Sequence, residues 1–127
     1  MTRDVTISWG FALILGALTP LAMAYLGLSV QWGAHPFWDV KTAFIGAGIG
    51  SVAALGLAWL RKAWRLVLGL LVVGGALSAA TYGKTQFAAS FAEDVLAGKL
   101  WFFGWIGIAA GLTLIVSEVR VGLRRLL

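Results

Sequence analysis

The chain contains 127 residues, of which 61% are apolar, and its mean hydropathy is +0.93. Ten Lys or Arg and five Asp or Glu give a net charge of +5. Soluble domains have roughly 45–50% apolar and about 25% charged residues, so this composition excludes a disordered chain, a solenoid and an ordinary soluble enzyme. The absence of cysteine excludes disulfides, thiolate metal sites and iron–sulfur clusters, and the length fits one domain over 1–127.

Four long runs without charged residues follow one another, over 5–38, 42–60, 66–83 and 100–117. A helix that crosses the hydrocarbon core needs about 20 mostly apolar residues, and an isolated strand leaves its backbone unpaired in lipid. The first run is longer than one span, and residues 31–36 interrupt it. We therefore predict an all-α integral membrane protein whose four transmembrane helices form a bundle. The predicted spans are about 8–30, 40–60, 66–83 and 100–118.

The first predicted span contains Pro20, which removes a backbone hydrogen bond and should bend the helix. The apolar character of this span continues to Val30, which favours a retained membrane helix over a signal peptide cleaved after Ala24. The connection between the second and third spans, 61–65, is very short. These two spans are therefore predicted to be antiparallel neighbours.

Between the third and fourth spans, Phe87, Phe91 and Val95 recur every four residues and define one apolar helical face. Ser90 also begins the pattern of a capping box, a pair of side chains that starts a helix. Two interpretations are open: an amphipathic interfacial helix around 86–98, or an outward extension of the fourth span from about Ser90. Because neither needs a ligand, a structural role is favoured.

Basic residues are distributed unequally between the two sides of the predicted bundle. Seven Lys or Arg belong to the side that holds both termini and the 61–65 connection, against three on the other side. Because the side richer in Lys and Arg stays in the cytoplasm, both termini are predicted to be cytoplasmic, in what we expect to be a bacterial inner membrane. Six basic residues are predicted to set this topology and to contact anionic lipids: Arg61, Lys62, Arg65, Arg120, Arg124 and Arg125.

Aromatic residues gather where the predicted spans meet the membrane surfaces, as is typical of rings that are partly apolar and partly polar. The inner belt is Trp9, Trp59 and Trp64, and the outer belt is Trp32, Trp38, Tyr82 and Trp101.

Small residues recur at four-residue spacing in three of the spans, which lets helix backbones approach closely. Most of them are expected to pack inside this chain's own bundle, and one stripe is left for a partner or a second copy. The predicted packing residues are Gly46, Gly50, Ala54, Gly75, Ala79, Gly107 and Gly111.

Mild polar side chains gather in the outer half of the predicted bundle: Tyr25, Ser29, His35, Thr42, Ser78 and Thr81. Converging hydroxyls could bind a lipid headgroup, a quinone carbonyl or a pigment. The favoured interpretation is that they bond to backbone carbonyls of their own or neighbouring helices. His35 with Asp39 alone falls far short of a metal site, so no metal or cofactor is expected, and His35 is predicted to be a solvated loop residue.

No charged residue lies deep within a predicted span, which argues against a proton-coupled pump. No catalytic constellation can be assembled, so the chain is not expected to be an enzyme, and charges held at a bilayer do not suit nucleic acid. The predicted function is a non-catalytic membrane subunit that packs into, stabilises or helps assemble a larger complex. The alternative is a small channel or transporter whose path forms between identical copies.

Overall fold

The computed structural model describes residues 2–118, with side chains at 10–61 and 63–118. Every regular element in this part of the chain is a helix, which confirms the all-α prediction. The elements are α1 (Thr2–Tyr25), α2 (Leu28–Gln31), α3 (Asp39–Gly56), α4 (Lys62–Ala89) and α5 (Val95–Val116). The predictions for Arg120, Arg124 and Arg125, and for the side chains of Trp9 and Lys62, lie outside the described residues.

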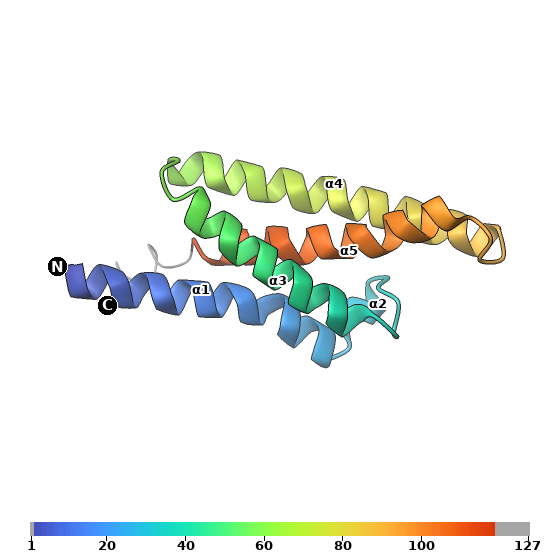
Figure 1. The fold of residues 1–127 in the computed structure, drawn as a ribbon, viewed down its shortest axis with the longest axis horizontal. Helices are drawn as coiled ribbons and strands as arrows, with labels where there is room; N and C mark the ends of the chain where they lie inside the picture. Colours follow the sequence, from blue (N-terminus) through green and yellow to red (C-terminus); the bar gives the residue numbers. More distant parts are fainter. Residues whose placement is uncertain (1, 119–127) are drawn as a thin grey trace.

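The four long helices run alternately in opposite directions along one axis (Figure 1). α5 is the central element, because it packs against α1, α3 and α4. α3 and α4 run antiparallel, as predicted, but both pack on α5 and make little contact with each other, so the prediction that they are neighbours is wrong. The short connection fixes only their adjoining ends, and the packing of each helix on α5 decides where the rest lies.

The bundle has two ends, which we name by their residues. The Arg65 end comprises the α3–α4 connection with the first turn of α4, residues 57–65, and the end of α5 with the two residues that follow it, residues 113–118. The hairpin end comprises the loop before α3 and the α4–α5 connection, residues 31–38 and 84–99, and the α4–α5 connection projects beyond α2 (Figure 1).

Two helices are long and apolar enough to cross a membrane: Ala63–Ala89 within α4, and α5. Only 17% of the most apolar part of α4 is buried inside the described structure, compared with 50% for α5. α4 therefore turns most of its apolar side chains outward. The apolar part of α1, Gly10–Tyr25, is shorter, and α3 begins with the charged residues Asp39 and Lys41. By length and composition, the described residues thus contain two candidate spans, and a four-span bundle stays a prediction.

The first predicted span ends earlier than expected. α1 stops at Tyr25, and Gly27 then adopts φ of 81°, in the left-handed region, before the short helix α2. A residue with a Cβ is strained in that region, so glycine there commonly terminates a helix. A continuous helix to residue 30 is therefore wrong.

The segment between the third and fourth predicted spans forms no separate interfacial helix. α4 continues to Ala89 and α5 begins at Val95, so the residues of this segment extend the two long helices into a hairpin. The predicted interfacial helix around 86–98 is wrong. The other interpretation, an outward extension of the fourth span, agrees with the structure, although α5 begins at Val95 and not at Ser90. Hydropathy located the apolar centres of these helices, but the polar residues of the hairpin do not interrupt a helix.

The hairpin turn is closed by side-chain caps and contains strained backbone. The Ser90 hydroxyl accepts a hydrogen bond from the Asp94 N–H at 2.9 Å, and Asp94 accepts one from the Ala97 N–H at 3.0 Å. Asp94 therefore caps the start of α5, the role that the sequence pattern gave to Ser90. Between these caps, Phe91 and Ala92 have φ of 54° and 67°, in a region that residues with a Cβ rarely adopt.

Glycines bring α3 and α5 into backbone contact. A Cβ added at Gly46 would lie 2.6 Å from the Ile106 carbonyl oxygen, and one at Gly50 would lie 2.5 Å from the Ala110 carbonyl oxygen. Ala54, one turn further on, is only 2% exposed. Real Cβ atoms do not approach so closely, so this packing depends on the missing side chains.

The α4–α5 contact uses small residues from both helices. A Cβ at Gly107 would lie 2.8 Å from the Ala76 Cβ, and one at Gly111 would lie 3.2 Å from the Gly69 carbonyl oxygen. Ala79 is half-buried. A Cβ added at Gly75, by contrast, would have nothing within 4 Å, so Gly75 takes no part in packing within the described structure.

Candidate functional site

The structure separates the six polar residues that the sequence places in one ligand site. Tyr25 is exposed, and its ring meets Phe44 edge-on with centroids 6.5 Å apart. Ser78 lies on the outward side of α4, where its hydroxyl donates to the Gly74 carbonyl at 2.9 Å. The six residues therefore do not come together within the described structure, because the spacing within each helix does not reveal how the helices are rotated relative to one another.

Ser29 and Thr42 meet at a small pocket that Pro20, Asp39 and Trp105 also line. Its volume is about 10 Å³, which is room for about one water molecule. The Thr42 hydroxyl donates to the Asp39 carbonyl at 2.9 Å, which is the bonding to the same helix that the favoured interpretation predicted. This pocket has no space for a larger ligand.

His35 is half-buried in an aromatic cluster at the hairpin end, so the prediction of a solvated loop residue is wrong. Its ring stacks on Trp38, with centroids 5.5 Å apart, and meets Trp101 edge-on at 5.2 Å. The His35 Nδ1 accepts a hydrogen bond from the Phe37 N–H at 3.1 Å, which occupies that nitrogen. The Trp101 Nε1–H donates to the Gly33 carbonyl at 2.8 Å and fixes the loop to α5.

Among residues 10–118 whose side chains are described, no three His, Asp or Glu form a group that could hold a metal.

A larger opening, the Lys84 groove, lies between α4, the loop before α3 and α5. Its volume is about 430 Å³, within the range of roughly 300–1,000 Å³ found for small-molecule sites. Ala80 and Trp105, 2% and 5% exposed, form its floor. Thr81 of the predicted polar set lies on its α4 wall. The principal lining residues are Trp32, Leu77, Ala80, Thr81, Lys84 and Trp105.

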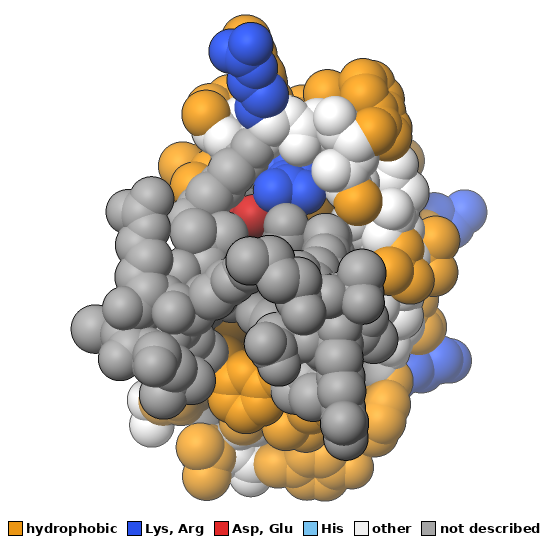
Figure 2. All heavy atoms as spheres, turned by 90° about the vertical axis from the view of Figure 1, so that its left-hand side faces the viewer, with side chains coloured by type: hydrophobic (Ala, Val, Ile, Leu, Met, Phe, Trp, Pro, Cys, Tyr) orange, Lys and Arg blue, Asp and Glu red, His pale blue; other side chains and the backbone are white. Residues whose placement is uncertain are grey.

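The Arg65 end contains a buried ion pair that the sequence analysis missed. The Arg65 Nε lies 3.1 Å from the Glu118 Oε1, and the two side chains are only 6% and 4% exposed. Arg65 also donates from Nη1 to the Ala58 carbonyl at 3.2 Å. Figure 2 views this end of the molecule, where acidic and basic atoms meet near the centre. The prediction that Arg65 contacts lipid headgroups is therefore wrong, whereas Arg61 is exposed.

A signal for this pair is present in the sequence. Arg65 immediately precedes one long apolar run, and Glu118 immediately follows another. In antiparallel helices these two positions lie at the same level, so opposite charges there can pair. The ion pair joins α4, α5 and the α3–α4 connection, which makes it a structural contact.

Over residues 2–118 the structure is all-helical, and two of its helices are long and apolar enough to cross a membrane. Comparisons with protein-family models, with curated proteins and with solved structures found no match.

Proposed function

We propose that the chain is a non-catalytic integral membrane subunit that binds a transmembrane helix of another membrane protein through the outer face of α4. The observation that carries this proposal is the Gly75 face, formed by Leu71, Gly74, Gly75 and Ser78. A Cβ at either glycine would have nothing within 4 Å, and Leu71 is 66% exposed. These residues lie on one side of α4, away from α5.

Two adjacent glycines weaken a helix, since each is less favourable than alanine by about 1 kcal/mol in a helix interior. On an outward face they gain nothing from packing within this chain. The two glycines do, however, form a shallow notch between larger side chains. A second helix can pack into this notch with close backbone contact. Such a notch suits a partner helix better than it suits flexible acyl chains.

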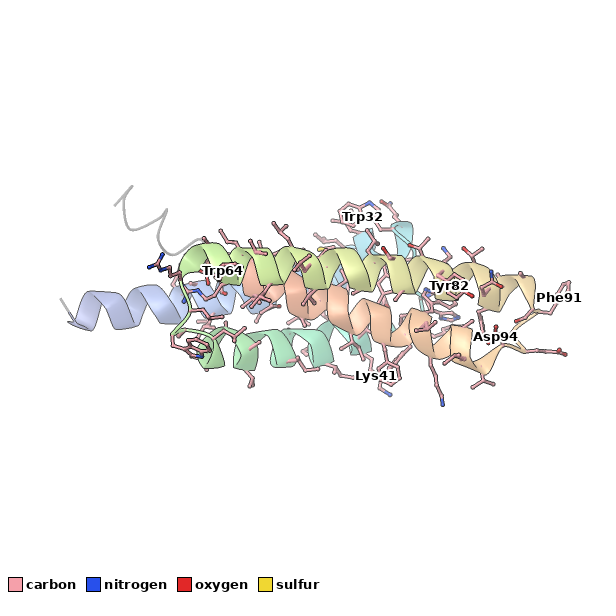
Figure 3. The ribbon with its side chains drawn as sticks, turned by 90° about the horizontal axis from the view of Figure 1, so that it is seen from above. Trp32, Lys41, Trp64, Tyr82, Phe91 and Asp94 are labelled. Carbon is pink, nitrogen blue, oxygen red and sulfur yellow. The ribbon has the colours of Figure 1, made fainter. Side chains whose placement is uncertain are left out.

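The length of α4 supports placing this face inside a bilayer. Trp64 and Tyr82 lie near the two ends of its apolar part (Figure 3), and both are exposed, at 60% and 59%. Tyr82 lies eighteen positions after Trp64, which at about 1.5 Å per residue gives roughly 27 Å. The hydrocarbon core is about 30 Å thick, so the two rings match its two surfaces. The hairpin end then projects from one surface, and the proposed topology leaves the Arg65 end at the cytoplasmic surface.

Size measurement of the purified protein tests the proposal. We expect a tagged chain extracted in mild detergent to elute in a particle that contains a different membrane protein in fixed ratio. Gly75→Leu should fill the notch and lower the amount of bound partner several-fold, without lowering the melting temperature of the chain itself. Gly48→Leu is the matched control, because Gly48 also has nothing within 4 Å but lies on α3. If both variants lower the amount of bound partner equally, α4 is not the surface that binds the partner.

A particle that is a closed ring of identical copies would overturn the subunit proposal. It would support instead the alternative, a channel or transporter whose path lies between copies.

A further inference from the structure

We propose that the Lys84 groove binds one phospholipid with a net anionic headgroup, such as phosphatidylglycerol. The inference rests on the proposal that the chain lies in a bilayer and goes beyond it by assigning a ligand to a particular site. It starts from Lys84, which is exposed, lines the groove and forms no ion pair with any side chain that the structure describes. The other lining residues are uncharged, so the groove carries a net positive charge.

The Lys84 side chain lies near the loop before α3. Gly33 has φ of 120°, and a Cβ placed on it would lie 3.8 Å from both Cδ and Nζ of Lys84. The lysine side chain therefore lies close to the Gly33 backbone, which also lines the groove. Since Trp101 holds Gly33 on its other side through the carbonyl, the loop that faces the ammonium is fixed in place. An anion can be bound there without first ordering the loop.

The rest of the groove is apolar and matches the acyl part of a lipid. Ala80 and Trp105 form the floor, and the exposed side chains of Trp32 and Leu77 flank it. The Thr81 hydroxyl lies one turn before Lys84 and Thr85 and can donate to a phosphate or ester oxygen. The Thr85 hydroxyl already donates to the Thr81 carbonyl at 2.9 Å. A soluble anion would gain only the polar contacts with Lys84 and Thr81, whereas a phospholipid also covers the apolar floor.

The groove lies at the depth where a lipid headgroup belongs. Lys84 follows Tyr82, the aromatic residue that marks one surface of the proposed bilayer, while Leu77 lies more than a turn deeper in α4. The ammonium is thus placed at the headgroup level and the apolar floor at the level of the first acyl carbons. Basic residues near an anionic leaflet contribute on the order of 1 kcal/mol each.

Native mass spectrometry of the delipidated full-length protein tests the proposal. Phosphatidylglycerol and phosphatidylcholine with the same acyl chains are titrated separately, with inorganic phosphate as a third arm. We expect one phosphatidylglycerol to bind about fivefold more tightly than phosphatidylcholine, the ratio that one such charge contact gives. Lys84→Met should abolish this preference, and Lys84→Arg should keep it. Lys99→Met, which removes an exposed lysine from the same end but outside the groove, should leave it unchanged.

Three results would overturn the proposal. The first is equal binding of the two lipids, and the second is an equal loss of the phosphatidylglycerol preference in the Lys84→Met and Lys99→Met variants. The third is displacement of the lipid by inorganic phosphate at similar concentration. The last would mean that a free anion is the ligand. None of these results alters the size of the purified particle, so failure here is distinguishable from failure of the subunit proposal.

Discussion

Gly46 shows how strongly single residues determine the spacing of these helices. Its missing side chain allows α3 to lie against the Ile106 carbonyl of α5, where even a methyl group would be 2.6 Å away. We predict that Gly46→Ala destabilises the protein by about 1–3 kcal/mol, since overpacking forces the two backbones apart. Unfolding in mixed detergent–SDS micelles, followed by circular dichroism, measures this change.

Gly48 provides the control for that variant, because it lies in the same helix with nothing within 4 Å. Gly48→Ala should be neutral or stabilising by up to about 1 kcal/mol, through helix propensity alone. If both alanine variants shift stability in the same direction by the same amount, the close approach of α3 to α5 is not a feature of the folded protein.

The buried ion pair of Arg65 and Glu118 also contributes to the stability of the folded protein. Removal of one member leaves the other charge buried without its partner, so Arg65→Gln should destabilise the protein by about 3–5 kcal/mol. Arg61→Gln, at an exposed position four residues earlier, should change stability by no more than about 0.5 kcal/mol. The double variant Arg65→Gln with Glu118→Gln should cost less than the sum of the two single variants. If the stability lost in the double variant equals the sum of the losses in the two single variants, the two side chains do not interact.

At the scale of an element, the α4–α5 hairpin stores strain in its turn. Ala92 has φ of 67°, and left-handed backbone costs a residue with a Cβ roughly 1–2 kcal/mol. We predict that Ala92→Gly raises the melting temperature, with a gain of about 1 kcal/mol. Ala88→Gly, only four residues earlier but inside α4, should lower stability by about 1 kcal/mol. A loss of stability in both glycine variants would contradict this turn geometry.

The same elements show what a sequence can and cannot predict. Hydropathy correctly indicates helices and locates the apolar centres of α4 and α5. It does not locate their ends, because Lys84 and Gln86 are compatible with a helix and only the Ser90 and Asp94 caps mark the turn. It also does not give the rotation of each helix about its axis, which separates Ser78 from Ser29. The pairing of Arg65 with Glu118 depends on which helices are adjacent, and that is settled by glycine packing on α5.

At the scale of the whole molecule, the proposed arrangement places the two ends of the bundle on opposite sides of a membrane. The Arg65 end carries Arg61 and an exposed Trp59, and the hairpin end carries Lys84, Glu93 and Lys99. The projecting hairpin, with Phe91 at its tip, extends beyond Tyr82 (Figure 3). Both functional proposals depend on this placement, since it gives the Gly75 face its lipid setting and Lys84 its headgroup level.

Labelling of single cysteines in intact spheroplasts is the most direct test of that placement, and the absence of cysteine from the chain provides a clean background. Glu93→Cys in the hairpin turn and Ala58→Cys in the α3–α4 connection are both at exposed positions. A membrane-impermeant maleimide should label Glu93→Cys in intact spheroplasts and Ala58→Cys only after lysis. Labelling of both cysteines from the same side would show that α4 does not cross the membrane.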